Sequence, residues 1–541
     1  MHAHYRLTLL MAALALLLAA LEASPFGRRV RLERAVRGVL ATAAAGSLLF
    51  VAVLWFRHAR FPFNLDLMEF GILQHVLRAL HHQPIYPAAS PDFVPFAYNP
   101  LFYYAVLPLV LILGPGLFPL RLFSILGTLG ATLTIFVAVA GRTRSRWWGL
   151  VTAGLFAGAY RAMDAYLDTA HSDSWLVFAA LLGTWLIDRN RSRWSNRAGL
   201  LLLVAAFWFK QHGAFFALGG ALYLARRDGL RRSWPDWVAL LLIGPVLYVA
   251  AGPALFGPGF HFYTWDVPRH WSRLDAATFL RLAGFFGRYY AILLLAALWL
   301  FVQRARTPRR DPGAWEFQLP FAALTAFMGA LDADSSNNVF IPLGTWLIVV
   351  GALGLHDLST RALPVRFARL GHLGLLLAFA ALAYDPREVA TSSRAGAKYA
   401  EMVAMLDSLP GRVYAPWIGQ LPRDYRFDPA AHWVALDDLE RAHLCGPRDV
   451  AVLLAPAIHP GAPAFVLANR RIETFTCLRA LTPCYVLDTD LGDRFAALRV
   501  LPKRWDHGWP RFLYRYDPAA ATAGGPPGLD FRGHAPHPAA P

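Results

Sequence analysis

The sequence predicts a polytopic α-helical membrane protein with a small soluble α/β domain at its C-terminal end. Of the 541 residues, 56% are hydrophobic and only 16% are charged, whereas a soluble domain carries about 25% charged residues. Apolar runs of about 17–22 residues, long enough to cross a bilayer core, recur along the chain. These runs are continuously apolar, which excludes a β-barrel, because the strands of a barrel would alternate.

Basic clusters between the apolar runs set the orientation. They lie at 28–37, 142–146, 189–197, 226–232, 304–310 and 361–369. Loops rich in Arg and Lys stay on the cytoplasmic side of a membrane. We therefore interpret the net charge of +17 as a topology signal, and we predict no nucleic-acid partner.

The clusters divide the chain into about 10–13 expected transmembrane helices. The clearest runs are 6–22, 38–56, 119–140, 147–165, 174–187, 236–256, 286–303, 316–331, 339–357 and 368–384. The segment 198–225 has basic clusters on both sides, so we expect a tight hairpin with its tip at 209–213. The run 101–116 would break the alternation as a full span, and we expect a re-entrant or interfacial helix there.

The same patterns divide the chain into four parts. Residues 1–37 are expected to form an N-terminal anchor helix and a cytoplasmic loop, and residues 38–384 a transmembrane domain whose largest outer loop is 57–118. After Tyr384 the polarity is mixed, with short β-like runs, so residues 385–517 predict an α/β domain on the periplasmic side. The Ala/Gly/Pro-rich residues 518–541 predict a disordered tail.

The composition is rich in Arg, Ala and Pro and poor in Lys, which is typical of a high-GC bacterial genome. We therefore expect a multi-pass protein of a bacterial inner membrane. All three cysteines, Cys445, Cys477 and Cys484, fall in the C-terminal domain. If that domain is exported, one disulfide can form, with Cys477–Cys484 as the nearest pair; buried thiols are the alternative.

Ionisable side chains gather in the outer loops, where they are costly unless they are used. Asp66 and Glu69, directly after the span 38–56, are the candidate catalytic residues. The candidate substrate-binding residues are Tyr98, Asn99, Arg161, His171, Asp173, Lys210, His212, Arg269, Arg288 and Asn338. Such a set suits transfer from a phosphorylated leaving group, since a carboxylate takes the acceptor proton and cations stabilise the departing phosphate.

Several of these residues have plainer alternatives. Lys210 lies between two apolar half-spans with no acidic residue near it in sequence, which favours phosphate binding over a snorkelling lysine. Arg269 and Arg288 are candidates for phosphate, or for pairing with Asp266. Asp332 and Asp334 form an Asp-x-Asp pair that suits a divalent cation, Mg²⁺ or Mn²⁺, or an ordinary polar turn. We predict no fixed metal-ligand set and no certain cofactor.

The order of the outer motifs resembles the C-type glycosyltransferases (the GT-C fold), which include the protein O-mannosyltransferases and the lipid A aminoarabinose transferase. Asp66 with Glu69, followed by Pro84–Pro87 and Tyr98–Tyr104, resembles the first outer loop of that superfamily. Further resemblances lie at 121–124, 171–173, 209–213 and 334–338. Together they cover roughly residues 38–357.

This resemblance implies a hexosyl or pentosyl transfer from a polyprenyl-phosphate-linked sugar on the outer face of the membrane. It implies that Asp66 is the general base, that the anomeric centre is inverted, and that Glu69 orients the acceptor or supports Asp66. The acceptor is a glycan, a lipid or a protein. Two departures concern the subfamily: the acidic residues are three apart rather than adjacent, and Asn99-Pro100-Leu101 replaces the usual Pro-Pro-Leu.

Three other functions fit a polytopic chain. A transporter or flippase would place ionisable residues near the bilayer midplane, whereas here they cluster at one face. An O-antigen ligase or an acyltransferase is a second alternative, although a ligase would gather its Arg and His in one large outer loop. A non-catalytic assembly subunit, docking through its C-terminal domain, is the third.

Overall fold

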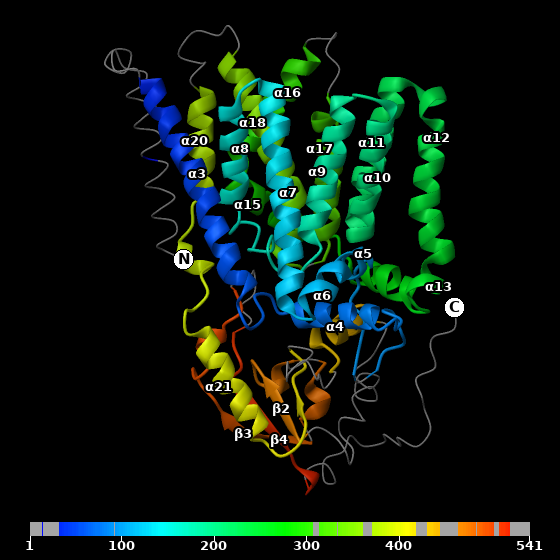
Figure 1. The fold of residues 1–541 in the computed structure, drawn as a ribbon, viewed down its shortest axis with the longest axis vertical. Helices are drawn as coiled ribbons and strands as arrows, with labels where there is room; N and C mark the ends of the chain where they lie inside the picture. Colours follow the sequence, from blue (N-terminus) through cyan, green and yellow to red (C-terminus); the bar gives the residue numbers. More distant parts are fainter. Residues whose placement is uncertain are drawn as a thin grey trace.

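The computed structural model describes residues 13, 32–90, 92–306, 313–332, 334–360, 370–417, 430–443, 464–475, 477–482, 484–501 and 508–519. A bundle of helices forms one end of the molecule and a small sheet forms the other (Figure 1). The expected anchor helix at 6–22, apart from residue 13, lies outside the described residues, as do Cys445 and the tail beyond Ala519.

The bundle helices run side by side, and sequence neighbours pack against each other (Figure 1). They are α3 Leu32–Ala59, α7 Leu117–Thr143, α8 Arg146–Gly158, α9 Asp173–Arg189, α10 Arg193–Phe209, α11 Ala214–Asp228, α12 Leu230–Leu241, η2 Leu242–Ala251, α16 Ala291–Ala305, α17 Ala314–Ala330, α18 Ile341–Thr360 and α20 Leu370–Leu382. The Arg-rich turns after α7, α9 and α11 all lie at the end away from the sheet (Figure 1).

Within the part of the chain that the structure describes, four helices are long and apolar enough to cross a membrane. They are Glu33–Ala59, Leu117–Thr143, Leu230–Phe256 and Asn337–Thr360, and the pair α15 (Ala276–Tyr289) and α16, bent by 92°, makes a fifth if it counts as one broken span. The other expected spans among the described residues are shorter helices packed alongside.

Short helices cover the end of the bundle that faces the sheet (Figure 1). They are α4 Glu69–Leu80, α5 Leu101–Ala105, α6 Leu107–Leu113, η1 Gln211–Gly213, α13 Gly252–Phe256, η3 Phe262–Asp266, α14 Val267–Trp271 and η4 Asn337–Phe340. Residues 101–113 are thus a short broken helix, and its last turn exposes Leu111, Ile112 and Leu113. The segment 198–225 is a hairpin of α10 and α11 with Lys210 at its tip.

The C-terminal domain contains a four-stranded sheet in the order β1-β2-β4-β3. The strands are β1 Val413–Tyr414, β2 Phe465–Ala468, β3 Tyr485–Asp490 and β4 Phe512–Tyr516; β1 and β2 are parallel and the other two pairs are antiparallel. The helices are η5 Pro386–Glu388, α21 Ala395–Asp407, α22 Trp433–Arg441, η7 Ile472–Thr474, η8 Arg479–Leu481 and η9 Ala496–Leu498. Cys477 and Cys484 are both free and buried, which corresponds to the buried-thiol alternative and not to the disulfide.

Glycines allow a close contact between α9 and α10, the helix that ends at Lys210. A Cβ on Gly199 of α10 would meet the carbonyl oxygen of Gly183 on α9 at 2.7 Å, and a Cβ on Gly183 would meet the Gly199 carbonyl at 2.6 Å. Small residues let two backbones approach in this way within a membrane. The α9–α10 crossing therefore has no room for a side chain at either position.

We expect Gly199→Val to force α9 and α10 apart and to cost about 1–3 kcal/mol, the usual cost of overpacking. The measurement is the midpoint of thermal unfolding of the purified protein in detergent. Gly46→Val is the control, because a Cβ at Gly46 on α3 has nothing within 4 Å. Equal midpoints for the two variants would contradict the close crossing.

Candidate active site

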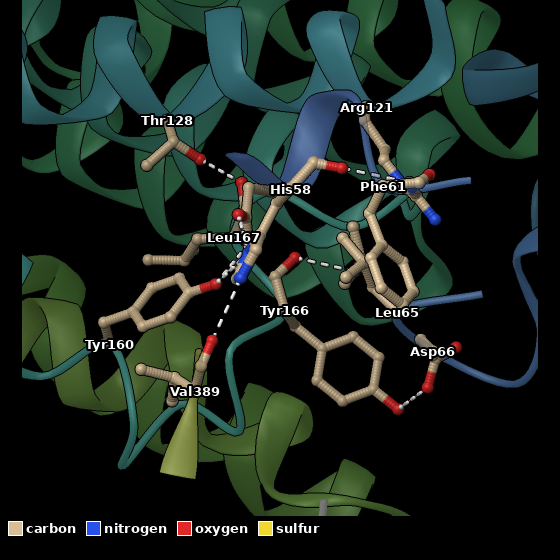
Figure 2. A network of polar contacts seen from close by, with 12 residues as sticks. His58, Phe61, Leu65, Asp66, Arg121, Thr128, Tyr160, Tyr166, Leu167 and Val389 are labelled. Atoms are coloured by element: carbon tan, nitrogen blue, oxygen red, sulfur yellow. Dashed lines mark hydrogen bonds and ion pairs between the residues drawn. The ribbon is translucent and has the colours of Figure 1, made fainter. Parts of the chain in front are cut away.

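Asp66 lies in the loop between α3 and α4, at the boundary of the bundle and the C-terminal domain. The side chain is buried, with 1% of the residue exposed. The Tyr166 hydroxyl donates to its Oδ1 (2.9 Å) and the Met68 N–H donates to its Oδ2 (3.1 Å). Figure 2 shows the Tyr166 ring pointing at this carboxylate. Since a carboxylate has about four acceptor positions, Asp66 keeps capacity for a further proton or donor.

Glu69 opens α4 and its carboxylate is fully used by the protein. Oε1 accepts from Arg121 Nε (2.9 Å) and from the Ala170 N–H (2.8 Å), and Oε2 accepts from Arg121 Nη2 (2.5 Å) and the Leu65 N–H (2.6 Å). Neither side chain of the Glu69–Arg121 pair is exposed by more than 1%. Glu69 is therefore placed to hold the loop around Asp66, which agrees better with the supporting role than with the chemistry itself.

Arg121, in the first turns of α7, gathers the chain that leads to Asp66. Besides Glu69, its guanidinium donates to the carbonyl oxygens of His58 (3.0 Å), Phe61 (2.6 Å) and Phe63 (2.5 Å). Figure 2 shows the guanidinium beside His58 and Phe61. In the sequence, Arg121 is a single arginine in an otherwise apolar run, which could have indicated a buried role. The sequence does not indicate which groups it contacts.

A second buried network lies directly behind this loop. His58 Nδ1 lies 2.8 Å from Asp168 Oδ2, and its Nε2 lies 3.0 Å from the Val389 carbonyl oxygen. The Tyr160 hydroxyl donates to Asp168 Oδ1 (2.6 Å). Figure 2 shows His58 between Tyr160 and Val389. The network ties the end of α3 to the segment that enters the C-terminal domain.

Asp173 is the centre of a further cluster, formed where α9 begins. Lys210 Nζ donates to its Oδ1 (2.8 Å), the Asn338 amide donates to its Oδ2 (3.0 Å), and His171 Nδ1 lies 2.5 Å from Oδ2. All four side chains are buried. The structure thus brings together four of the predicted residues. Lys210 has no acidic residue near it in sequence, but the fold places Asp173 beside it.

Aromatic rings join the two carboxylate clusters. The Tyr98 ring lies 5.6 Å from Lys210 Nζ and 5.1 Å from the His171 ring, and the Tyr166 ring lies 5.4 Å from the His171 ring. Burial, with the nearby carboxylates of Asp438 and Asp173 adding to it, raises the pKa of Tyr98 well above its usual value. Tyr98 therefore stays a neutral phenol between a cation and two acids.

The hairpin tip is tied to the first outer loop. The Asn99 amide donates to the Phe207 carbonyl (2.7 Å), and the Gln211 amide donates to the Ala97 carbonyl (2.8 Å). His212 lies beside Gln211, and its backbone carbonyl accepts from the Thr325 hydroxyl (3.3 Å). Several buried oxygens around these clusters have no hydrogen-bond partner among the described residues; they include Asn64 Oδ1, Asn99 Oδ1 and Ser172 Oγ. Such unpaired buried oxygens suit a polar ligand.

Three predicted cationic residues contact other groups. Arg161 pairs with Asp164 (3.1 Å) and Glu388 (2.8 Å). Arg269 is exposed and lies 3.4 Å from Asp266, as one of the two interpretations expected. The Arg288 guanidinium lies over the Tyr289 ring, at 4.9 Å.

Asp332 and Asp334, the pair that suits a divalent cation by sequence, bind the guanidinium of Arg441 instead. Arg441 Nη1 is 3.0 Å from Asp332 Oδ1 and 3.1 Å from Asp334 Oδ2. Within the described parts of the chain, no group of three or more His, Cys, Asp or Glu side chains is arranged to hold a metal ion. The geometry of this pair is thus that of an ion-paired turn.

The C-terminal domain covers the Asp66 loop, which the sequence did not indicate. The Leu501 N–H donates to the Leu65 carbonyl (3.1 Å), His432 Nε2 lies 3.0 Å from the Leu67 carbonyl oxygen, and the Gln74 amide donates to the Ala430 carbonyl (3.1 Å). Helix α22 adds a buried Asp438, which is hydrogen-bonded to Arg441. Both domains therefore build the surroundings of Asp66.

Comparison with solved structures identifies the class of fold. The chain is similar to ArnT from Cupriavidus metallidurans bound to undecaprenyl phosphate, with a TM-score of 0.51 and 15% identity over 87% of this chain and 98% of that one. The same protein in the apo state is matched with a TM-score of 0.48 and 15% identity over 88% and 99% of the two chains. No protein-family profile and no curated protein sequence matches the chain.

The chain therefore has the polytopic helical GT-C fold, the fold that the order of its outer motifs predicted. One solved protein with this fold is ArnT, a lipid A aminoarabinose transferase. At 15% identity this likeness shows the fold alone.

We expect Glu69→Gln to lower the stability of the protein by about 3–5 kcal/mol, because it leaves the buried Arg121 guanidinium without its counter-charge. The measurement is thermal unfolding in detergent. Glu388→Gln is the matched control, since its partner Arg161 is partly exposed and keeps Asp164. A Glu69→Gln protein as stable as this control would contradict a stabilising role for the Glu69–Arg121 ion pair.

The pH dependence of stability tests the buried Asp438. Burial raises the pKa of its carboxyl to about 7, against the opposing effect of Arg441. The folded value lies above the unfolded one, so this contribution is complete at low pH and is lost as the pH rises through about 7. We expect the unfolding midpoint to fall on going from about pH 5 to about pH 8, and Asp438→Asn to reduce that fall. Asp493 is exposed, so the Asp493→Asn variant should show the same fall in the unfolding midpoint as the wild-type protein.

Proposed function

We propose that the protein is a membrane glycosyltransferase that moves a sugar from a polyprenyl-phosphate carrier to an acceptor on the outer face of the membrane. The observation that supports this most directly is the joint cluster of a buried carboxylate, Asp66, and a buried ammonium, Lys210, linked through Tyr98, Tyr166 and His171. The ArnT fold, which in one solved structure holds undecaprenyl phosphate, supports the same class of carrier lipid.

The chemistry follows from where the charges lie. Asp66 accepts the proton of an acceptor hydroxyl or amine, whose oxygen or nitrogen attacks the anomeric carbon of the donor. The bond from that carbon to the phosphate oxygen breaks, and polyprenyl phosphate leaves with the electron pair. Attack on the face opposite the leaving group inverts the anomeric centre.

Lys210 is the proposed group for the departing phosphate. An ammonium has three N–H donors, and the described contacts use one of them, to Asp173. His171 and Asn338 hold the other oxygen of Asp173, so the lysine is held in place before the substrate binds. In a buried site such a fixed charge stabilises a developing phosphate charge without reorganisation.

The charge distribution supports the outer face for this reaction. The Arg-rich turns lie at the end of the bundle away from the sheet, while α4, which begins three residues after Asp66, and the C-terminal domain lie at the other end (Figure 1). Under the positive-inside rule the Arg-rich end is cytoplasmic. The site and the C-terminal domain are therefore periplasmic in our proposal, in a bacterial inner membrane.

The experiment uses the full chain in nanodiscs with radiolabelled undecaprenyl-phosphate sugars, scoring release of sugar to water or to a membrane extract. We expect Asp66→Asn to reduce turnover by about 10²–10⁴-fold, the usual contribution of a general base. Asp92→Asn, exposed in the same outer loop, should turn over like wild type.

Two results would overturn the proposal. Turnover in Asp66→Asn equal to that of Asp92→Asn would remove Asp66 as base. Movement of the intact donor across the bilayer, with no cleavage by the wild-type protein, would instead identify a flippase.

A further inference from the structure

A groove runs between α10 and α12 at the end of the bundle away from Asp66. Its volume is about 350 Å³, within the range of about 300–1,000 Å³ that is usual for ligand sites. Apolar side chains from both helices line most of it, among them Leu200 and Val204 from α10 and Ala239 and Leu240 from α12, and it continues to Ile243. It begins near the Arg-rich end of the bundle and extends toward its middle.

The helix on one side of the groove is little covered by protein. In Leu230–Phe256 only 11% of the most apolar window is buried, compared with 56% in Leu117–Thr143 and 89% in Asn337–Thr360. Figure 1 shows α12 at the edge of the bundle. A membrane helix with this exposure faces lipid, and lipid tails have free access to the space between it and α10.

The end of the groove is basic. Arg197 Nε lies 3.0 Å from Asp236 Oδ1, and the Arg193 guanidinium donates to the Arg232 carbonyl (3.3 Å). Arg193 and Arg197 are four apart on α10, and Arg232 and Asp236 are four apart on α12, so each pair lies on one helix face. Three guanidinium groups against one carboxylate leave a net positive charge at the mouth.

Two exposed tryptophans indicate where the basic end of the groove lies relative to the membrane surface. Trp194 is 75% exposed and Trp234 is 62% exposed. Trp194 directly follows Arg193, and Trp234 lies two residues after Arg232. Exposed tryptophan at a helix end is typical of the membrane–water interface. The basic end of the groove therefore lies at the level of lipid head groups, and the apolar part lies at the level of their tails.

We propose that this groove binds one anionic phospholipid of the cytoplasmic leaflet. Its phosphate lies among Arg193, Arg197 and Arg232, and an acyl chain follows the apolar side chains toward Ile243. Basic pockets between transmembrane helices on the cytoplasmic side are known to suit anionic head groups. The site is separate from the proposed sugar transfer and does not depend on it.

The bound lipid has a structural consequence at the far end of the same helix. Helix α12 continues through η2 into α13, whose Phe256 carbonyl accepts the N–H groups of Ile85 (3.0 Å) and Tyr86 (3.1 Å) in the first outer loop. A lipid that fills the gap between α10 and α12 holds this helix against the bundle. It therefore helps to hold the outer loop that carries the site.

The test is native mass spectrometry of the full chain in detergent, titrated with phosphatidylglycerol or with phosphatidylcholine. We expect one phosphatidylglycerol to be retained more tightly than any phosphatidylcholine. Arg193→Gln with Arg232→Gln should weaken it by about 25-fold, at about fivefold for each arginine near the membrane surface. Arg144→Gln with Arg146→Gln, at the same end of the bundle in the α7–α8 turn, should retain it as wild type does.

A second pair of variants tests the groove by shape instead of charge. Ala239→Trp fills the groove, whereas Val238→Trp adds the same side chain at an exposed neighbour that does not line it. We expect only Ala239→Trp to lose the retained lipid. Equal retention of the two phospholipids, or equal loss in the groove and control variants, would overturn the proposal.

Discussion

The buried ion pair between Arg121 and Glu69 is the interaction on which the site depends. Arg121 belongs to α7, and its guanidinium donates to carbonyl oxygens in the last turn of α3 and in the loop after it. It also donates to the carboxylate of Glu69, the first residue of α4. Glu69 in turn receives N–H groups from Leu65 and Ala170. A charge pair excluded from water repays its desolvation only with such complete hydrogen bonding, and here that bonding also fixes the backbone that carries Asp66.

The second constraint is that two domains share one loop. The bundle contacts it through Arg121 and Tyr166, and the C-terminal domain contacts it through Leu501 and His432. The polar backbone of a loop at a membrane boundary needs partners from whichever side covers it. The C-terminal domain is therefore part of the wall of the site rather than an appended module.

Charge at the two ends of the bundle is organised differently. At the Asp66 end several ionisable groups are buried and paired, as in the Lys210–Asp173 and Arg121–Glu69 contacts. At the opposite end the arginines are more exposed and outnumber the acids, and exposed tryptophans accompany them. Buried pairs hold a fixed geometry suited to chemistry, whereas an exposed basic rim suits the surface of an anionic leaflet.

The sequence by itself determined the class of the protein, because apolar length, loop charge and the change of polarity after Tyr384 are local patterns. It also indicated Asp66, Asp173 and Lys210 as outer-face residues. Only the tertiary structure decided their partners: Glu69 meets Arg121 from 52 residues further along, and Lys210 meets Asp173 from 37 residues before it. These contacts depend on how helices pack and on which domain covers the loop, and no local spacing encodes either.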